Sequence, residues 1–172
     1  MLAPLLVLTV ALASAETPPR ACGAPVYRQL DFWIGTWAVS VGSTVVGEDI
    51  VEKTLDGCAI LEHWTDARGR RGESLFYVEP AGGGEPAAAL RWKQVWVTGT
   101  GQVKEKTLVE RRPDGSVRFE GFAITAGDRR ADRTTLTPLA DGRVRQVIEQ
   151  SADGGKTWTV GFDAVYERKD AD

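Results

Sequence analysis

The chain has 172 residues, of which 42% are hydrophobic, and a formal net charge of −3 at pH 7. A chain of this size fits one domain with one substantial core. Acidic and basic residues are interspersed, so the sequence lacks the basic surface that a nucleic-acid backbone requires, and we expect no nucleic-acid partner.

Residues 1–15 are predicted to be a secretory signal peptide. Residues 2–12 form an apolar run that is too short to span a bilayer, and Ala13-Ser14-Ala15 has the small-x-small pattern of a cleavage site. The segment before the apolar run carries no Lys or Arg. We expect cleavage after Ala15, a periplasmic or secreted protein, and no membrane anchor. A lipid anchor at Cys22 is disfavoured because Arg20 places a cation in front of it.

The two cysteines of the chain, Cys22 and Cys58, are predicted to form a disulfide. An even pair in an oxidising compartment most simply pairs with itself, and this bond would attach an N-terminal arm, residues 16–30, to a strand. Metal ligation or a catalytic thiol would need partner side chains, and His63 is the single histidine. We therefore expect no metal site and no cofactor.

A tryptophan motif marks the start of the folded domain, which we place at residues 31–169. Residues 31–37 read DFWIGTW, and an alternating run over residues 38–41 follows. Gly35 allows the backbone to bend between a helical turn and a first strand. A helical turn or two over residues 26–33 is expected to plug one end of the fold.

Beyond this motif, short alternating segments are separated by turn signals about every ten residues, which is typical of an antiparallel sandwich or barrel. Residues 81–86 are expected to form a flexible loop. We predict an all-β fold, a single antiparallel up-and-down barrel of about ten strands. The expected strands are 36–41, 45–54, 59–65, 74–79, 90–97, 103–111, 117–124, 133–137, 144–150 and 158–168.

Alternation indicates which side chains face inward. Trp158, Phe162 and Tyr166 share one face of the last expected strand, and we expect this aromatic face to lie in the core. Trp92 and Trp96 are expected inside because leaving two indoles in water is the costlier choice, and Gln94 shares their face. Glu62 lies on the same face as Trp64, whereas residues 144–150 carry polar groups on both faces. An interior with scattered Glu, Gln and Arg has room for water or a ligand.

Several segments together resemble a bacterial lipocalin-like family of unknown function. They are DFWIGTW at 31–37, Gly57-Cys58 followed by Glu62-His63-Trp64, QVWV at 94–97, RVRQ at 143–146, and DGGKTW at 153–158 followed by Phe162-Asp163. The resemblance covers most of the mature chain and implies a calycin-type barrel that is often exported. In lipocalins the tryptophan of G-x-W packs under a basic residue of the final strand, which implies a contact between Trp37 and Arg168. The rest of the lipocalin signature is not visible, so no specific ligand is implied.

One motif has two interpretations. Residues 151–158 fit the Asp-box of sialidase-type propellers, but a propeller needs several copies, and the chain has one. We expect a hairpin in which Asp153 accepts hydrogen bonds from turn amides and Trp158 enters the core.

The leading functional hypothesis is a binding module that holds a small, largely apolar molecule inside the barrel. The expected ligand-binding residues are Glu62, Trp64, Trp92, Gln94, Trp96, Arg145 and Phe162. We assign no catalytic residue and expect a monomer or weak dimer.

Two other functions stay open. An isomerase or hydrolase would use Glu62, Glu149 and Arg145 inside the barrel, where a desolvated carboxylate pair could split its pKa values. A protein-binding or inhibitory barrel would use its loops and have a filled interior. His63 could also act as a proton shuttle or haem ligand, as in nitrobindin-like barrels, but a lone histidine is more often a surface or packing residue.

Overall fold

The computed structural model describes residues 22–79 and 90–169. The expected signal peptide at residues 1–15, the first part of the N-terminal arm and the expected loop at 81–86 lie outside the described residues.

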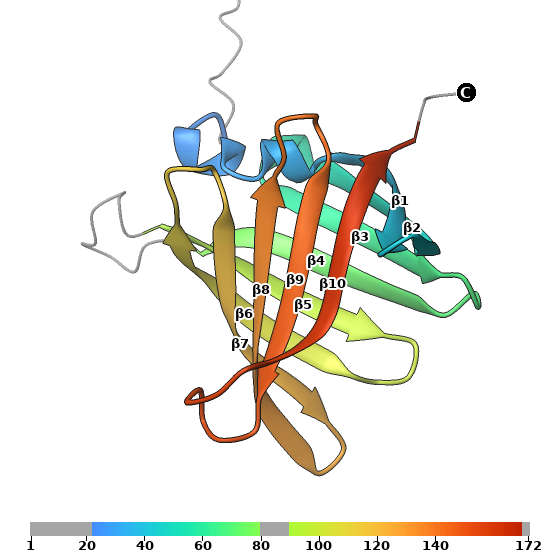
Figure 1. Cartoon of the computed structure of the whole chain (residues 1–172). Helices are drawn as coiled ribbons and strands as arrows, with labels where there is room; N and C mark the ends of the chain where they lie inside the picture. The colour runs from blue at the N-terminus through green and yellow to red at the C-terminus, as the bar shows by residue number, and fades with distance from the viewer. Residues whose placement is uncertain (1–21, 80–89, 170–172) are drawn as a thin grey trace, which may run out of the picture.

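The protein is a closed barrel of ten antiparallel strands in an up-and-down order, in which β1 pairs with β10 to close the sheet (Figure 1). This confirms the predicted fold class. The strands are β1 (Gly35–Val41), β2 (Thr44–Thr54), β3 (Ala59–Asp66), β4 (Arg71–Glu79), β5 (Arg91–Thr98), β6 (Val103–Arg111), β7 (Val117–Thr125), β8 (Asp128–Pro138), β9 (Val144–Ser151) and β10 (Thr159–Arg168).

Nine of the expected strands agree with these bounds to within three residues, and β8 differs most because it begins at Asp128 rather than at Arg133. Four of the five residues that the prediction left out, Asp128–Asp132, are charged. Charged residues hide the alternation of a strand when one of them, here Asp132, points into the interior.

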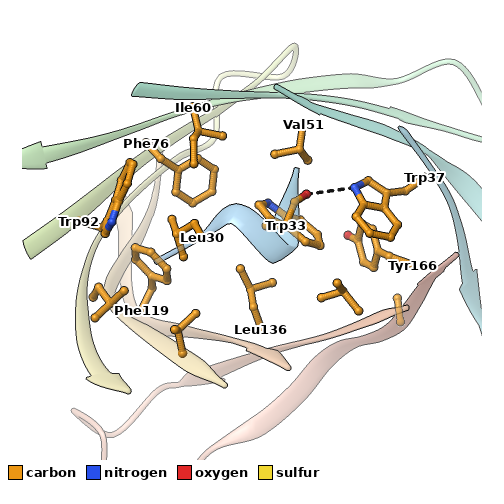
Figure 2. Close-up of a cluster of buried hydrophobic side chains, with 14 of the residues drawn as sticks. Leu30, Trp33, Trp37, Val51, Ile60, Phe76, Trp92, Phe119, Leu136 and Tyr166 are labelled. Atoms are coloured by element: carbon orange, nitrogen blue, oxygen red, sulfur yellow. Dashed lines mark hydrogen bonds between the residues drawn. The ribbon is translucent and has the colours of Figure 1, made fainter. Parts of the chain in front are cut away.

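The expected N-terminal plug is present as two short 3₁₀ turns, η1 (Pro25–Arg28) and η2 (Asp31–Trp33), which cover one end of the barrel (Figure 1). Leu30 and Trp33 are fully buried inside the plugged end of the barrel. Figure 2 shows them surrounded by inward side chains of the strands. No helix in residues 22–79 and 90–169 is long and apolar enough to cross a membrane.

The tryptophan motif fastens the plug to the closing strands. Trp37 Nε1 donates a hydrogen bond to the carbonyl oxygen of Trp33 at 3.1 Å (Figure 2). The guanidinium of Arg168 lies 4.5 Å from the centre of the Trp37 ring, as the resemblance implies. The Trp33 ring in turn packs on Tyr166 of β10, with ring centres 4.7 Å apart. These contacts join both closing strands to the plug.

The apolar core fills the plugged end of the barrel. Trp92 belongs to this core, where its Nε1 donates to the carbonyl oxygen of Val26 at 2.9 Å. The other large members contributed by the strands are Val39, Val51, Ile60, Phe76, Phe119, Leu136 and Val144.

The predicted disulfide between Cys22 and Cys58 is confirmed, with a Cα–Cα distance of 5.0 Å. It ties the segment before η1 to the start of β3. The bond closes a loop with a sequence separation of 36, and the chain-entropy account gives it a stabilisation of about 4 kcal/mol.

The expected position of Trp158 is wrong. The register between β9 and β10 shifts between Val160 and Phe162, which makes Gly161 an extra residue in β10. Side chains that precede Gly161 therefore point to the opposite side of the sheet from the one that simple alternation predicts. Val160 is 54% exposed, and Trp158 packs outside the barrel with the Arg133 guanidinium 4.1 Å from its ring centre. Asp153 behaves as predicted, because it accepts hydrogen bonds from the amides of Lys156 and Thr157.

The two tryptophans give a matched test of this core. Trp37→Ala should lower the free energy of unfolding by about 3–5 kcal/mol, because it removes a fully buried indole and leaves a cavity. Trp158→Ala removes an indole that packs outside and should cost only about 1–2 kcal/mol. Urea unfolding of both variants measures the difference, and equal losses would contradict the placement of the two side chains.

Candidate functional site

A cavity of about 280 Å³ occupies the barrel interior beyond the apolar core. Because the strands alternate in direction, the ends of β3 and β5 and the start of β6 lie at the end opposite the plug, and residues from these segments line the cavity. Toward this end the wall combines the rings of Trp64, Trp96 and Phe162 with Lys104, which lies opposite Trp96, and deeper in the barrel the wall is polar. Its polar lining consists of Glu62, Gln94, Lys104, Lys106, Thr134, Gln146 and Tyr166, with Thr98, Gln102 and Ile148 completing the wall.

The cavity brings together five of the residues proposed from the sequence: Glu62, Trp64, Gln94, Trp96 and Phe162. Trp92 shares the inward face of β5, but it lies one step closer to the plug and belongs to the core. The structure therefore does not place Trp92 in the wall of this cavity, because the plug covers that end of the barrel.

Arg145 and Glu149 were also expected inside, and the structure places both on the outer face of β9. Arg145 forms two hydrogen bonds to Asp163, at 2.8 and 2.6 Å, and Glu149 is held by Arg133 at 2.6 and 2.8 Å. The inward face of β9 is that of Val144 and Gln146, both buried. The predicted Glu62–Glu149 pair is thus wrong.

His63 also lies outside the cavity. Its side chain faces away from the Glu62 and Trp64 side of β3, with Nε2 3.5 Å from Glu52 and Nδ1 3.9 Å from Glu73. This position agrees with a surface residue and gives His63 no access to a ligand in the lumen. Among the described residues, no group of three metal-binding side chains is assembled.

Two glycines shape the aromatic wall. A Cβ atom on Gly72 would stand 2.3 Å from Trp96 Cζ2, and one on Gly47 would stand 2.6 Å from Trp64 Cη2. Each indole therefore lies against the neighbouring strand at a point where any larger residue would push it away. Because Gly47 and Gly72 have no side chain, both indole rings can lie close to the wall of the barrel and leave space in the cavity.

A buried ion cluster that sequence reasoning missed lies on the inner wall of the barrel, where it joins β6 to β8 over Gly121 of β7. Asp132 is fully buried and forms ion pairs with Lys106 and, at 3.2 Å, with Lys104. Lys106 Nζ also donates to Thr134 Oγ1 at 2.5 Å. Burial lowers the pKa of Lys106 to about 8, although the charge of Asp132 opposes this shift. The signal in the sequence was Leu108, an apolar residue on the same face of β6 as both lysines.

The carboxyl group nearest to Glu62 in the interior is that of Asp49, not of Glu149 as expected. Asp49 lies opposite Trp64 and Glu62 opposite Val51, so the two acids are diagonal neighbours on the inner face of β2 and β3. Burial raises the pKa of Asp49 to about 9, and the negative charge of Glu62 adds to the effect. Burial also raises the pKa of Glu62, against opposing hydrogen bonds from Ser74 and Asp49. Asp49 therefore holds its proton at neutral pH.

The remaining polar groups form short chains of hydrogen bonds. Gln94 Nε2 donates to Ser74 Oγ at 3.0 Å, which leaves the Ser74 hydroxyl free to donate to Glu62. Tyr166 Oη donates to Gln146 Oε1 at 2.8 Å. Gln94 Oε1 and Glu62 Oε2 are both buried without a hydrogen-bond partner in the described part of the chain.

Comparison with known proteins finds no match to this chain among protein-family models or among curated proteins. The geometry of the site therefore carries the functional argument. A lumen with aromatic rings, buried acids beside buried lysines, and acceptors without a donor is suited to hold a small molecule.

The Asp49–Glu62 pair makes stability depend on pH. The folded protein keeps a proton on Asp49 that the unfolded chain releases near its ordinary pKa of 3.8, so stability should fall as the pH rises from about 5 to 7.5, by at most about 1.4 kcal/mol per unit for this proton. Lys106 acts in the opposite sense only above pH 8, because its pKa is lowered to about 8. Asp49→Asn should flatten this slope and be the more stable protein at the upper end.

Urea unfolding at several pH values measures the slope. Asp163→Asn is the matched control, because hydrogen bonds from Arg145 lower the pKa of Asp163 and keep its titration below this range. A slope for Asp49→Asn equal to that of the unmodified protein would contradict the proton on Asp49.

Proposed function

We propose that the protein is a binding barrel that holds a small, largely apolar molecule in the cavity at its open end. The observation that carries this proposal is the lumen itself, about 280 Å³ with aromatic rings near the mouth and polar groups at the bottom. Sites for small molecules are typically concave and mostly apolar, with a few placed polar groups.

The size of the cavity limits its ligand. Pockets for small molecules start at about 300 Å³, so this cavity suits a compact molecule rather than a long lipid chain. A wider depression of about 570 Å³ at the mouth shares Trp64, Trp96, Thr98 and Gln102 with the cavity. A substituent on the ligand would extend into that depression.

We further propose that the protein acts outside the cytoplasm and is related to the lipocalin-like family named above. The Cys22–Cys58 disulfide supports export, because such bonds persist in oxidising compartments. The packing of Arg168 on Trp37 at the barrel closure supports the relationship, since it is the contact that the resemblance implies.

An acid–base enzyme is the second candidate, and the Asp49–Glu62 pair favours it. Glu62 lines the cavity, and a carboxyl group whose pKa is raised by burial can exchange protons near neutral pH. Asp49 itself is fully buried and does not line the cavity. Binding leads because Asp49 is closed off from the cavity and Glu62 also interacts with the buried lysines, so burial of these acids has a role other than proton exchange. The third alternative, a protein-binding or inhibitory barrel that uses its loops and has a filled interior, fits this lumen less well.

Native mass spectrometry tests the binding function. Protein purified from its natural host should carry a small molecule that is released on unfolding. Ile148→Trp should abolish this cargo, because Ile148 lines the cavity and a larger side chain fills it. Ile50→Trp is the matched control, since Ile50 is exposed on the outer face. Repeated preparations of the unmodified protein without a bound molecule would contradict the proposal, as would equal cargo in both variants.

A further inference from the structure

We infer that the ligand is a neutral molecule with a flat ring system that lies against Trp64 and Trp96 and presents an N–H or O–H donor to Gln94 and Glu62. This inference rests on the proposed binding function and specifies its ligand class. It is carried by the shape of the aromatic wall, by the buried acceptors and by the balance of charge in the lumen.

The shape follows from the glycines. Trp64 and Trp96 come from β3 and β5, and each six-membered ring lies over a glycine of a neighbouring strand, Gly47 or Gly72. Both indoles line the cavity and so present ring surface to it. Phe162 stands edge-on to Trp64, with ring centres 6.3 Å apart and an interplanar angle of 84°. Two indoles along one wall form a platform on which a flat ring makes the largest contact.

The donor follows from the buried acceptors. Gln94 is 7% exposed and Glu62 is 4% exposed, and both line the cavity. Gln94 Oε1 is without a partner among the described residues, whereas its Nε2 is already bonded to Ser74. A buried acceptor that stays unpaired is costly, so a ligand edge that donates here gains more than one that accepts.

The charge of the ligand follows from the groups that face one another across the lumen. Lys104 and Lys106 carry two positive charges, and Asp132 balances one of them. Glu62, a carboxyl group in the lining, is the second acid, and its charge interacts with both lysines. A charged ligand would leave one buried charge without compensation, whereas a neutral ligand keeps the balance.

Three probes with the same ring system separate these features: 2-naphthol, its methyl ether 2-methoxynaphthalene, and 2-naphthoate. Isothermal titration calorimetry at pH 7 should show 2-naphthol binding about tenfold more tightly than either of the others, the effect of one well-placed hydrogen bond or one uncompensated charge. The comparison uses the unmodified protein, so it does not depend on the folding of any variant.

Two variants locate the contacts. Gln94→Met removes the acceptor and should erase the preference for 2-naphthol over its ether. Gly72→Ala should weaken all ring probes, because the new methyl group displaces the Trp96 indole into the lumen. Arg145→Gln is the control on the outer face and should leave every affinity unchanged. Thermal unfolding establishes that each variant is folded.

The outcomes distinguish the ligand class from the function. Equal binding of naphthol and ether would overturn the donor, and tightest binding of 2-naphthoate would overturn neutrality, while both results leave a binding barrel. If no probe binds but the host protein carries a small molecule, the flat-ring class is wrong and the proposed function stands. If no probe binds and the host protein carries nothing, both are wrong.

Discussion

A barrel of ten strands encloses more space than a barrel of eight, in which inward side chains just fill the interior, and this excess volume governs the structure. At one end the chain fills the excess with its own N-terminal segment, which places Leu30 and Trp33 inside the strands. The wall supplies Phe76, Trp92 and Phe119 around them. At the other end the wall residues are polar or lie flat, and a lumen remains. One constraint thus produces both the core and the candidate site.

The charges in the lumen are better explained by binding than by stability. Replacing a buried ion pair, such as that of Lys106 and Asp132, by well-packed apolar residues often leaves the stability of a protein unchanged or increases it. Asp49 has the further cost of a carboxyl group that must hold its proton when folded. The two lysines nevertheless face two acids, Asp132 and Glu62, so acidic and basic groups lie together in the lumen. In the binding function that we propose, such an interior orients the ligand by hydrogen bonds, and the rings supply most of its contact area.

The sequence reveals the features that depend on local pattern. Strand number followed from alternation and the disulfide from the cysteine count, whereas the Trp37–Arg168 contact was implied by the resemblance to lipocalins. The inward or outward direction of a side chain was predicted wrongly where the alternation of a strand is interrupted or absent. A single residue, Gly161, shifts the register and turns Trp158 outward. In β9 both faces are polar, so Arg145 could not be placed by alternation. The buried lysines were missed because charged residues normally face water, and only a partner on a distant strand, Asp132, makes their burial tolerable.

Tyr166 connects the two halves of the interior. Its ring packs on Trp33 in the plugged core, and its hydroxyl donates to Gln146 in the wall of the cavity. The position of Gln146 is therefore fixed by a side chain that the plug itself holds in place. Trp37 joins the same group, because it bonds the backbone of Trp33 and lies under Arg168. A rigid bottom to the cavity is thus a consequence of the same contacts that close the barrel, and a ligand meets polar groups whose orientation was settled by folding.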